Sequence, residues 1–242
     1  MGQGEHVYAT AMTAAAAAAV SGVAYASSTL LPWPGIFDRR NEATWRVSSD
    51  EIALTFDDGP DPNRTPRILD ELACAGAFAT FFLIGSRVTA CSRLVQRILT
   101  EGHAIGNHTL NHQSLVWRGE AFVEHAIVRA QQTIFDACGI APDIVRPPFG
   151  RRDTTFYGVA ARLHLRPVFW SRDTLDWTGV RASVIASRLG SARGGDVVLM
   201  HDGAPRATGT LEALVAGLAQ LSARGLTPRR CLSLSGTTGV AA

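Results

Sequence analysis

Short apolar runs alternate with amphipathic stretches along most of the chain, and this alternation predicts the fold. The apolar runs end in polar residues, whereas the stretches between them carry apolar residues at helical spacing and often stop at a glycine. Strands that alternate with helices are typical of a parallel sheet covered by helices. We therefore predict an α/β fold with about seven strands in a single catalytic domain.

The predicted helices and strands can be placed by residue number. Thr65 is expected to be an N-cap with Pro66 as the first helical residue, and Gly102 and Gly139 are expected to end helices. The predicted strands are 51–58, 79–85, 103–108, 144–146, 167–171, 197–201 and 231–235, and the predicted helices are 66–75, 91–101, 119–138, 154–163, 180–193 and 209–224.

The N-terminal segment has a different composition from the rest. Residues 9–31 are small and apolar, and Ala24-Tyr25-Ala26 offers an A-x-A pattern for a signal peptidase. However, no Lys or Arg precedes this run, so a signal peptide, an uncleaved membrane anchor and a surface helix all stay open. We expect residues 1–47 to be a signal-like or anchor segment with a linker, residues 48–242 to be the catalytic domain, and the protein to be secreted or bound to the cell envelope.

Composition narrows the function classes. The 242 residues are 46% hydrophobic and 18% charged, which is enough apolar material for a large core. The formal net charge of +2 requires no basic face, so we expect no nucleic-acid partner. All 23 basic residues are Arg, which excludes lysine chemistry. The four cysteines form no CxxC pair and are expected to be buried small hydrophobes, with one disulfide left open.

Carboxylates and imidazoles follow two of the predicted strands. Asp57 and Asp58 are adjacent, and two ionised carboxylates repel each other unless a cation lies beside them. His108 and His112 are four residues apart, a spacing that places two imidazoles on one face of a helical turn and suits a shared metal. Taken alone, the two aspartates are also common in an ordinary turn, and two histidines at this spacing can occur by chance.

Three further segments follow later strands. Arg146 precedes the rigid loop Pro147-Pro148-Phe149-Gly150, Asp176 stands beside Trp177, and His201 closes the strand that contains Leu199. Each alone also fits a surface turn, a helix start or a structural histidine. The carboxyl ends of parallel strands gather into one site, so the joint occurrence of all five segments predicts an active site.

These five segments resemble the five motifs of the polysaccharide deacetylase family, the NodB-homology domain of family 4 carbohydrate esterases. The resemblance covers about residues 48–235, and order, spacing and content all agree. The motifs are Thr55-Phe56-Asp57-Asp58-Gly59, His108-Thr109-Leu110-Asn111-His112, Arg146-Pro147-Pro148-Phe149-Gly150, Asp173-Thr174-Leu175-Asp176-Trp177 and Leu199-Met200-His201.

The resemblance implies a distorted (β/α) barrel and metal-dependent removal of acetyl groups from an N-acetylated glycan such as peptidoglycan or chitin. It implies a divalent metal, expected to be zinc. The family often has Tyr where Phe149 stands, but the role implied there uses the backbone. The implied roles are metal binding by Asp58, His108 and His112, a general base in Asp57 oriented by Arg146, a general acid in His201 tethered by Asp176, an oxyanion donor in the Phe149 N–H, and an acetyl pocket with Pro148, Trp177 and Leu199.

Other functions are weighed against this one. A metal-retaining carbohydrate-binding protein without turnover is disfavoured because Asp57, Arg146, Asp176 and His201 are all present. A phosphotransfer hydrolase built on the two aspartates would leave both histidines unused and would lack a lysine. An acetylxylan-type O-deacetylase stays open, because the loops between the motifs set the substrate.

Overall fold

A seven-stranded parallel sheet forms the centre of the protein in a computed structural model that describes residues 43–231. The strands lie in the order β5-β4-β3-β2-β1-β7-β6, and all neighbouring pairs are parallel. Their bounds are Ala53–Gly59 (β1), Thr80–Leu83 (β2), Ala104–Asn107 (β3), Ile144–Val145 (β4), Arg166–Pro167 (β5), Arg172–Asp173 (β6) and Val197–His201 (β7).

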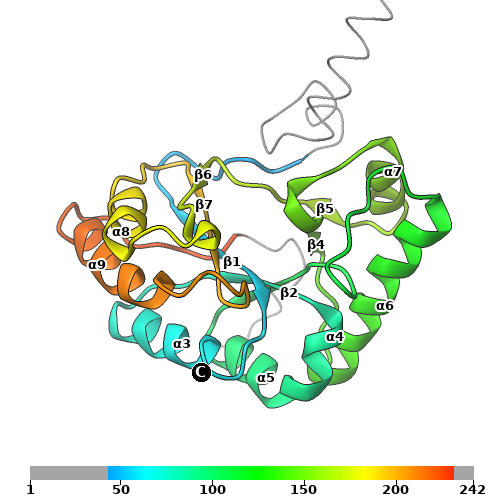
Figure 1. Ribbon diagram of the computed structural model, residues 1–242, viewed down its shortest axis with the longest axis horizontal. Coiled ribbons are helices and arrows are strands. Elements are labelled where there is room, and N and C mark those ends of the chain that lie inside the picture. The colour runs from blue at the N-terminus through cyan, green and yellow to red at the C-terminus, as the bar shows by residue number, and fades with distance from the viewer. Residues whose placement is uncertain (1–42, 232–242) are drawn as a thin grey trace, which may run out of the picture.

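Helices wrap around the outside of the strands, as Figure 1 shows. The longest, α6, ends at Gly139, whose left-handed backbone suits a glycine. The α-helices are Thr65–Cys74 (α3), Gly85–Val88 (α4), Ser92–Thr100 (α5), Glu120–Cys138 (α6), Thr154–Arg162 (α7), Ala182–Gly190 (α8) and Thr210–Ser222 (α9), and the 3-10 helices are Thr89–Cys91 (η1), Pro148–Gly150 (η2) and Asp176–Thr178 (η3).

The sheet is curled so that its two outer strands come together. β5 and β6 are consecutive in the chain, yet they lie at opposite ends of the strand order. Only residues 168–171 join them, and this linker first bonds to β4, through Val168 N–H and Val145 O, and then to β7, through Ser171 N–H and Val197 O. The distorted barrel expected from the motifs is therefore confirmed.

The strands bury both of their faces, which explains their nearly continuous apolar runs. Along β1, Leu54 and Phe56 point outward into the layer under the helices, whereas Ala53 belongs to a second buried cluster inside the curl. Because side chains alternate along a strand, Thr55 and Asp57 also face the interior. The first acidic residue of the candidate site is thus placed inside the barrel.

Several expected elements differ from those observed. The segment 167–171 forms only the end of β5, the two-residue strand β6 was not predicted, and most of the expected strand 231–235 lies outside the described residues. The expected helix 180–193 is the shorter α8. Thr65 is the first helical residue rather than the N-cap, because its hydroxyl is engaged with the buried carboxyl of Asp202.

The start of the domain also differs from the expected boundary at residue 48. Thr44 exchanges backbone hydrogen bonds with Pro167 and Phe169, and the Trp45 ring stacks on Phe169 at 4.6 Å. The alanine-rich segment 9–31 lies outside the described residues. Within residues 43–231, no helix has the length and apolar content needed to cross a membrane.

All four cysteines are free, and Cys231 alone is buried, so the expectation of burial fails for the other three.

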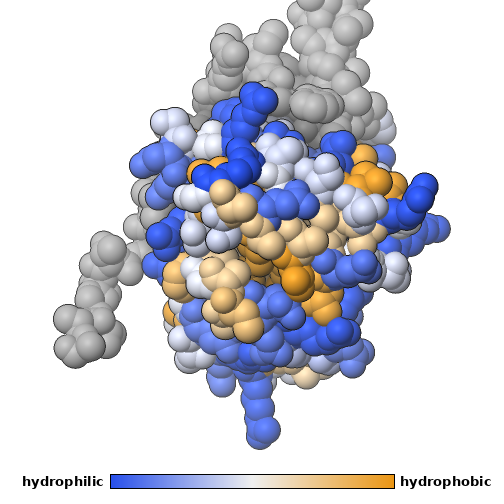
Figure 2. Space-filling view, turned by 90° about the vertical axis from the view of Figure 1, so that its left-hand side faces the viewer, coloured by the Kyte–Doolittle hydropathy of each residue, from blue (hydrophilic) through white to orange (hydrophobic). Residues whose placement is uncertain are grey.

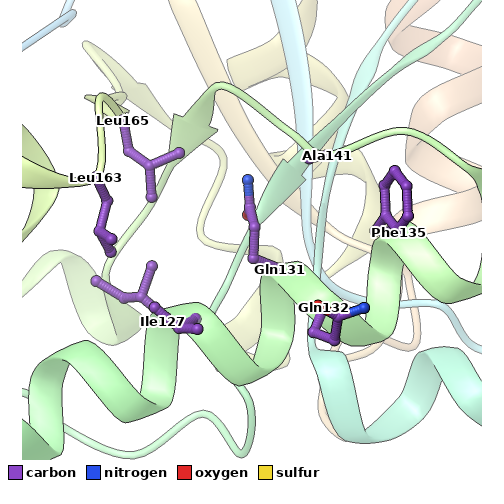
Figure 3. A pocket seen from close by; sticks show the side chains of 8 residues that line it. Ile127, Gln131, Gln132, Phe135, Ala141, Leu163 and Leu165 are labelled. Atoms are coloured by element: carbon purple, nitrogen blue, oxygen red, sulfur yellow. The ribbon is translucent and has the colours of Figure 1, made fainter.

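The outer surface carries two apolar features, one on the face of α8 and α9 and one along α6. The face formed by α8 and α9 shows an apolar strip surrounded by polar side chains (Figure 2), where Val184 and Val215 are exposed. A hollow of about 270 Å³ lies along α6 (Figure 3), and none of its lining residues is titratable. The hollow is lined by Ile127, Val128, Gln131, Gln132, Phe135, Ala141, Leu163 and Leu165.

Candidate active site

The polar residues that follow the strands meet at the carboxyl end of the barrel. Asp57 and His201 are register partners on the neighbouring parallel strands β1 and β7, so their side chains leave the sheet side by side. His108 follows β3, and its imidazole Nε2 lies 3.7 Å from Asp57 Oδ2. Asp57 and His108 are buried, although both carry titratable groups. The convergence expected from the strand ends is therefore present.

Asp58, His108 and His112 offer three ligand atoms that lie within 4.8 Å of one another. The Nε2 atoms of His108 and His112 lie 3.5 and 3.1 Å from Asp58 Oδ1. The four-residue spacing of the two histidines predicted that they share a face of a helical turn, and this is wrong. The segment that joins them is an irregular loop in which Thr109 and His112 have left-handed backbones, with φ of 67° and 54°.

This donor set fits a divalent metal ion. His108 Nδ1 lies 2.7 Å from the Arg146 carbonyl oxygen, so Nδ1 donates a hydrogen bond to it and Nε2 is the atom that faces Asp58. Asp58 Oδ1 is itself buried and makes no hydrogen bond of good geometry within the described residues. A buried carboxylate oxygen that faces two imidazole nitrogens requires a positive charge between them, which either a proton on His108 or a metal ion can supply. Two histidines and one carboxylate also leave coordination positions open, as catalytic metal sites do.

Electrostatics keep the carboxylate of this triad ionised. Burial alone would raise the pKa of Asp58, but its close contact with His108 and the positive charge on the neighbouring imidazoles hold it far below its ordinary value. Burial and the charge of His108 lower the pKa of His112 to about 4, although both aspartates oppose this shift. Asp58 is therefore an anion and His112 a neutral imidazole near pH 7, which are the protonation states that bind metals. Burial would lower the pKa of His108, but the two aspartates raise it, so a metal ion that binds here would displace a proton from His108.

Arg146 is fully buried inside the barrel and fixes the position of Asp57. Its Nη1 donates hydrogen bonds to Asp57 Oδ1 at 2.6 Å and to the Thr55 hydroxyl at 2.9 Å. Its Nε and Nη2 donate to the carbonyl oxygens of Val168 and Phe169 at 3.0 and 2.9 Å. A guanidinium with its donors satisfied in this way can stay charged in a dry interior, where it compensates the carboxylate.

His201 is held by the fully buried carboxylate of Asp176. Asp176 Oδ1 lies 2.8 Å from His201 Nδ1, and Oδ2 accepts hydrogen bonds from the His201 backbone N–H at 2.8 Å and the Thr210 hydroxyl at 2.7 Å. Burial would lower the pKa of His201, but the hydrogen bond and charge of Asp176 outweigh it and raise the pKa to about 9. His201 is thus an imidazolium at neutral pH, with Nε2 left for substrate.

The residues expected around the acetyl pocket lie on the loops and strand at the same end. Phe149 has a left-handed backbone, with φ of 61°, and its half-exposed ring packs on His112 at 4.6 Å. Pro148 and Leu199 are buried, and Trp177 is half-exposed beside Asp176 on η3. The Phe149 ring therefore covers one side of a candidate metal ligand.

The family follows from comparison with known proteins. A family model described as polysaccharide deacetylase matches residues 46–168, about half of the chain. The chain belongs to the polysaccharide deacetylase family. The family expected from the five motifs is thus confirmed, and with it the classification of the chain as a hydrolase of this family.

Two peptidoglycan-N-acetylglucosamine deacetylases of Bacillus cereus are among the relatives of this polysaccharide deacetylase. One is 39% identical over 75% of this chain and 87% of its own length, and the other is 38% identical over 72% of this chain and 64% of its own length. The chain thus spans just under two thirds of the second relative. A chitooligosaccharide deacetylase of Azorhizobium caulinodans is 39% identical over 64% of this chain and 74% of its own length.

A solved structure shares the fold of this family member. It is a peptidoglycan N-acetylglucosamine deacetylase in complex with 4-naphthalen-1-yl-N-oxidanyl-benzamide. The TM-score is 0.77 with 33% sequence identity, over 82% of this chain and 95% of that chain. The curled sheet of this chain therefore belongs to a fold already seen in a deacetylase.

Several residues that shape the site of this polysaccharide deacetylase were not predicted from the sequence. The Thr55 hydroxyl accepts from Arg146, and the Thr210 hydroxyl donates to Asp176. Arg87 contacts the backbone of Asp58, as described below. Thr55 lies within the first motif and could have been found there. Thr210 and Arg87 lie far from any motif in the chain, so no local pattern indicates them.

Proposed function

We propose that this chain is a metal-dependent N-deacetylase that acts on N-acetylglucosamine in peptidoglycan or chitooligosaccharide glycans. The observation that carries the proposal is the pairing of Asp57 and His201 on adjacent strands, beside the cluster of Asp58, His108 and His112. One group of the pair is an anion that can take a proton, and the other is a cation that can give one. The names of the relatives support the substrate class.

Asp58, His108 and His112 would hold the metal ion, and we propose Zn²⁺ because two imidazoles and one carboxylate suit it. When bound, such an ion supplies Lewis acidity that polarises the acetyl carbonyl and lowers the pKa of water at the site. Phe149 packs on His112 and would shield one side of this position from solvent.

Asp57 would act as the general base. Its Oδ1 is occupied by Arg146, which leaves Oδ2, 3.7 Å from His108 Nε2, on the side of the metal ligands. Oδ2 can accept the proton of a water that attacks the acetyl carbon. Arg146 would keep the carboxylate in this orientation throughout the reaction, since it is fixed by its own bonds to Val168 and Phe169.

His201 would act as the general acid for the leaving amine. An amide nitrogen leaves poorly unless it is protonated, so a cationic donor is needed within reach of the leaving nitrogen. Asp176 fixes the imidazole through Nδ1 and keeps it protonated, which directs the Nε2 proton to the substrate. We further propose that the Phe149 backbone N–H donates to the oxyanion, and that Pro148, Trp177 and Leu199 surround the acetyl methyl.

Two alternatives are weighed against this function. An acetylxylan-type O-deacetylase would use the same residues, but an alkoxide leaves more readily than an amide anion and needs no donor as strong as His201. A non-catalytic carbohydrate-binding protein would not need the buried Arg146 and Asp176, which are costly to retain in a protein interior without a reaction to serve.

The cellular location is a second proposal. We propose that the protein acts on glycans of the cell envelope, either secreted or held there by the anchor expected in residues 9–31. The relatives named as peptidoglycan deacetylases support this, because their substrate is a cell-wall polymer.

Acetate release tests the proposed function. Full-length protein is incubated with N-acetylglucosamine oligomers, peptidoglycan and acetylated xylan, first with added Zn²⁺ and then with a chelator. We expect release from an N-acetylated glycan that stops with the chelator and returns with Zn²⁺. Release from xylan alone would favour the O-deacetylase. No release from any substrate by folded, Zn²⁺-loaded protein would favour the non-catalytic alternative.

A further inference from the structure

A four-residue segment, Ile84–Arg87, touches three stretches of chain at the candidate site. Its backbone N–H groups bind the end of β1 and the loop after β3: Ile84 N–H donates to Gly59 O at 2.8 Å, and Gly85 and Ser86 N–H donate to Thr109 and Leu110 O at 2.9 and 2.8 Å. The segment thus connects the strand end that bears Asp58 with the loop that bears both histidines. No part of it belongs to any of the five motifs.

Arg87 extends this connection to the loop after β7. Its Nη1 donates to Asp58 O at 2.6 Å and to Gly203 O at 3.0 Å. Gly203 lies two residues beyond His201, the last residue of β7, so one guanidinium nitrogen joins the strand end of a candidate metal ligand to the loop that follows the candidate acid. The side chain is half-buried and is therefore shielded in part from competing water.

The Asp58 backbone needs such support. Its φ of 72° lies in the left-handed region, which residues other than glycine adopt only at a cost in free energy. This conformation turns the Asp58 carboxylate toward the two histidines, and it exposes the carbonyl oxygen that Arg87 binds. A strained conformation persists only where its surroundings hold it.

The backbone at Gly203 lies so close to Asp58 and Arg87 that only a glycine fits there. A Cβ atom at position 203 would collide with both the Asp58 carbonyl oxygen and Arg87 Nη1. The loop after β7 also binds β1 directly, because Asp202 N–H donates to Asp57 O at 3.1 Å. The contact of Arg87 with two carbonyl oxygens is therefore built by close backbone packing.

We propose that Arg87 is a positioning residue for the metal centre: it holds the left-handed backbone of Asp58 in the orientation that binds metal and sets the distance to the loop of His201. The inference rests on the proposed function, since it assigns a role toward the metal bound there. Loss of a residue that orients a metal ligand typically weakens metal binding by about 10–100-fold.

Zn²⁺ affinity tests this role directly. Metal-free wild type, Arg87→Ala, Arg87→Lys and the control Arg93→Ala, which removes an exposed arginine from α5, are titrated with Zn²⁺ against a chelating dye. We expect Arg87→Ala to bind Zn²⁺ about 10–100-fold more weakly. Arg87→Lys should recover most of this loss because an ammonium can also donate to two carbonyl oxygens. Arg93→Ala should match wild type.

Further readouts separate positioning from stability. Thermal unfolding of each metal-free variant shows whether it is folded, and in the Zn²⁺-saturated enzymes kcat should fall for Arg87→Ala with little change in KM. Equal Zn²⁺ affinity in wild type and folded Arg87→Ala would overturn the role of Arg87. If Arg87→Ala does not fold, wild-type affinity in Arg87→Gln would overturn it. A wild type that neither binds Zn²⁺ nor releases acetate would instead contradict the proposed function.

Discussion

Arg146 Nη1 lies 2.6 Å from Asp57 Oδ1 inside the barrel, and the two residues come from strands that are not neighbours. β2 and β3 lie between β1, which contains Asp57, and β4, which Arg146 follows. The side chain of Arg146 therefore reaches across the interior of the curled sheet. This ion pair joins the candidate base to the packing of the core, so it has consequences for both stability and activity.

Replacement of Arg146 should destabilise the fold. In Arg146→Met, Asp57 would be left buried without its cation, and loss of one partner of a buried pair costs about 3–5 kcal/mol. We expect the free energy of unfolding, measured in urea, to fall by this amount. Arg67→Met removes an exposed arginine from α3 and should change it little. Equal free energies of unfolding for Arg146→Met and Arg67→Met would show that the ion pair of Arg146 and Asp57 does not stabilise the fold.

Replacement of Asp57 should separate metal binding from turnover. Asn at position 57 can still accept a hydrogen bond from Arg146, but it cannot take a proton from water. We expect Asp57→Asn to bind Zn²⁺ as wild type does and to lose about 10²–10⁴-fold in kcat. Acetate release and dye competition measure the two quantities. Turnover close to that of wild type would show that the base has been assigned wrongly.

Replacement of a metal ligand should remove both properties. His112→Ala deletes one of three converging ligand atoms, so the ion would be bound too weakly to stay in place. We expect this variant to stay inactive when Zn²⁺ is added after chelator treatment, whereas wild type recovers. The matched control is His125→Ala, which removes a histidine of α6 outside the cluster. If His112→Ala regains activity when Zn²⁺ is added back, His112 is not a metal ligand.

Replacement of His201 should affect amides more than esters. Without the imidazolium, an amine must leave without a proton, whereas an alkoxide leaves more easily. We expect His201→Ala to slow N-acetyl hydrolysis by about 10²–10⁴-fold and O-acetyl hydrolysis by clearly less. Matched N-acetyl and O-acetyl sugar substrates provide the comparison. An equal loss on both would count against a role for His201 in protonating the leaving group.

The pH profile should depend on Asp176. The pKa of His201 is raised from 6.5 to about 9, so the acid form persists, and the rate should fall only as the pH rises through about 9. In Asp176→Asn the pKa of His201 should drop, and the alkaline limb of kcat/KM should move to lower pH. The stability from this pair should be fully present below pH 6.5 and lost as the pH rises through about 9. An unmoved alkaline limb would show that another group titrates there.

Sequence patterns predicted the long elements and the residues at their ends, because both leave local signals. α6 carries apolar residues at helical spacing, β1 begins as a short apolar run, and Asp57, Asp58 and His201 directly follow apolar runs. The two-residue strands β5 and β6 are too short for any period to appear. β5 and β6 are strands because they pair with β4 and β7, and a single sequence does not show which segments pair.

The proximity of His108 and His112 was predicted for the wrong reason. The spacing suits a helical turn, but the left-handed backbones of Thr109 and His112 achieve the same proximity in a loop. Arg87 was missed because its partners are backbone carbonyl oxygens 29 and 116 positions away in the chain. Every residue has a backbone carbonyl oxygen, so a contact of this kind does not depend on the type of the partner residue. It forms only when the fold brings the two parts of the chain together.

The contact between Thr44 and β5 bears on how this protein behaves at high concentration. Thr44 takes the place of a further strand beside Pro167 and Phe169, and Trp45 covers the same place with its ring. An uncovered sheet edge offers free N–H and C=O groups to the strands of other molecules, which is a common route to aggregation. A shortened protein that begins at Ser48 would uncover this edge, so we expect it to aggregate at a lower concentration than the full chain.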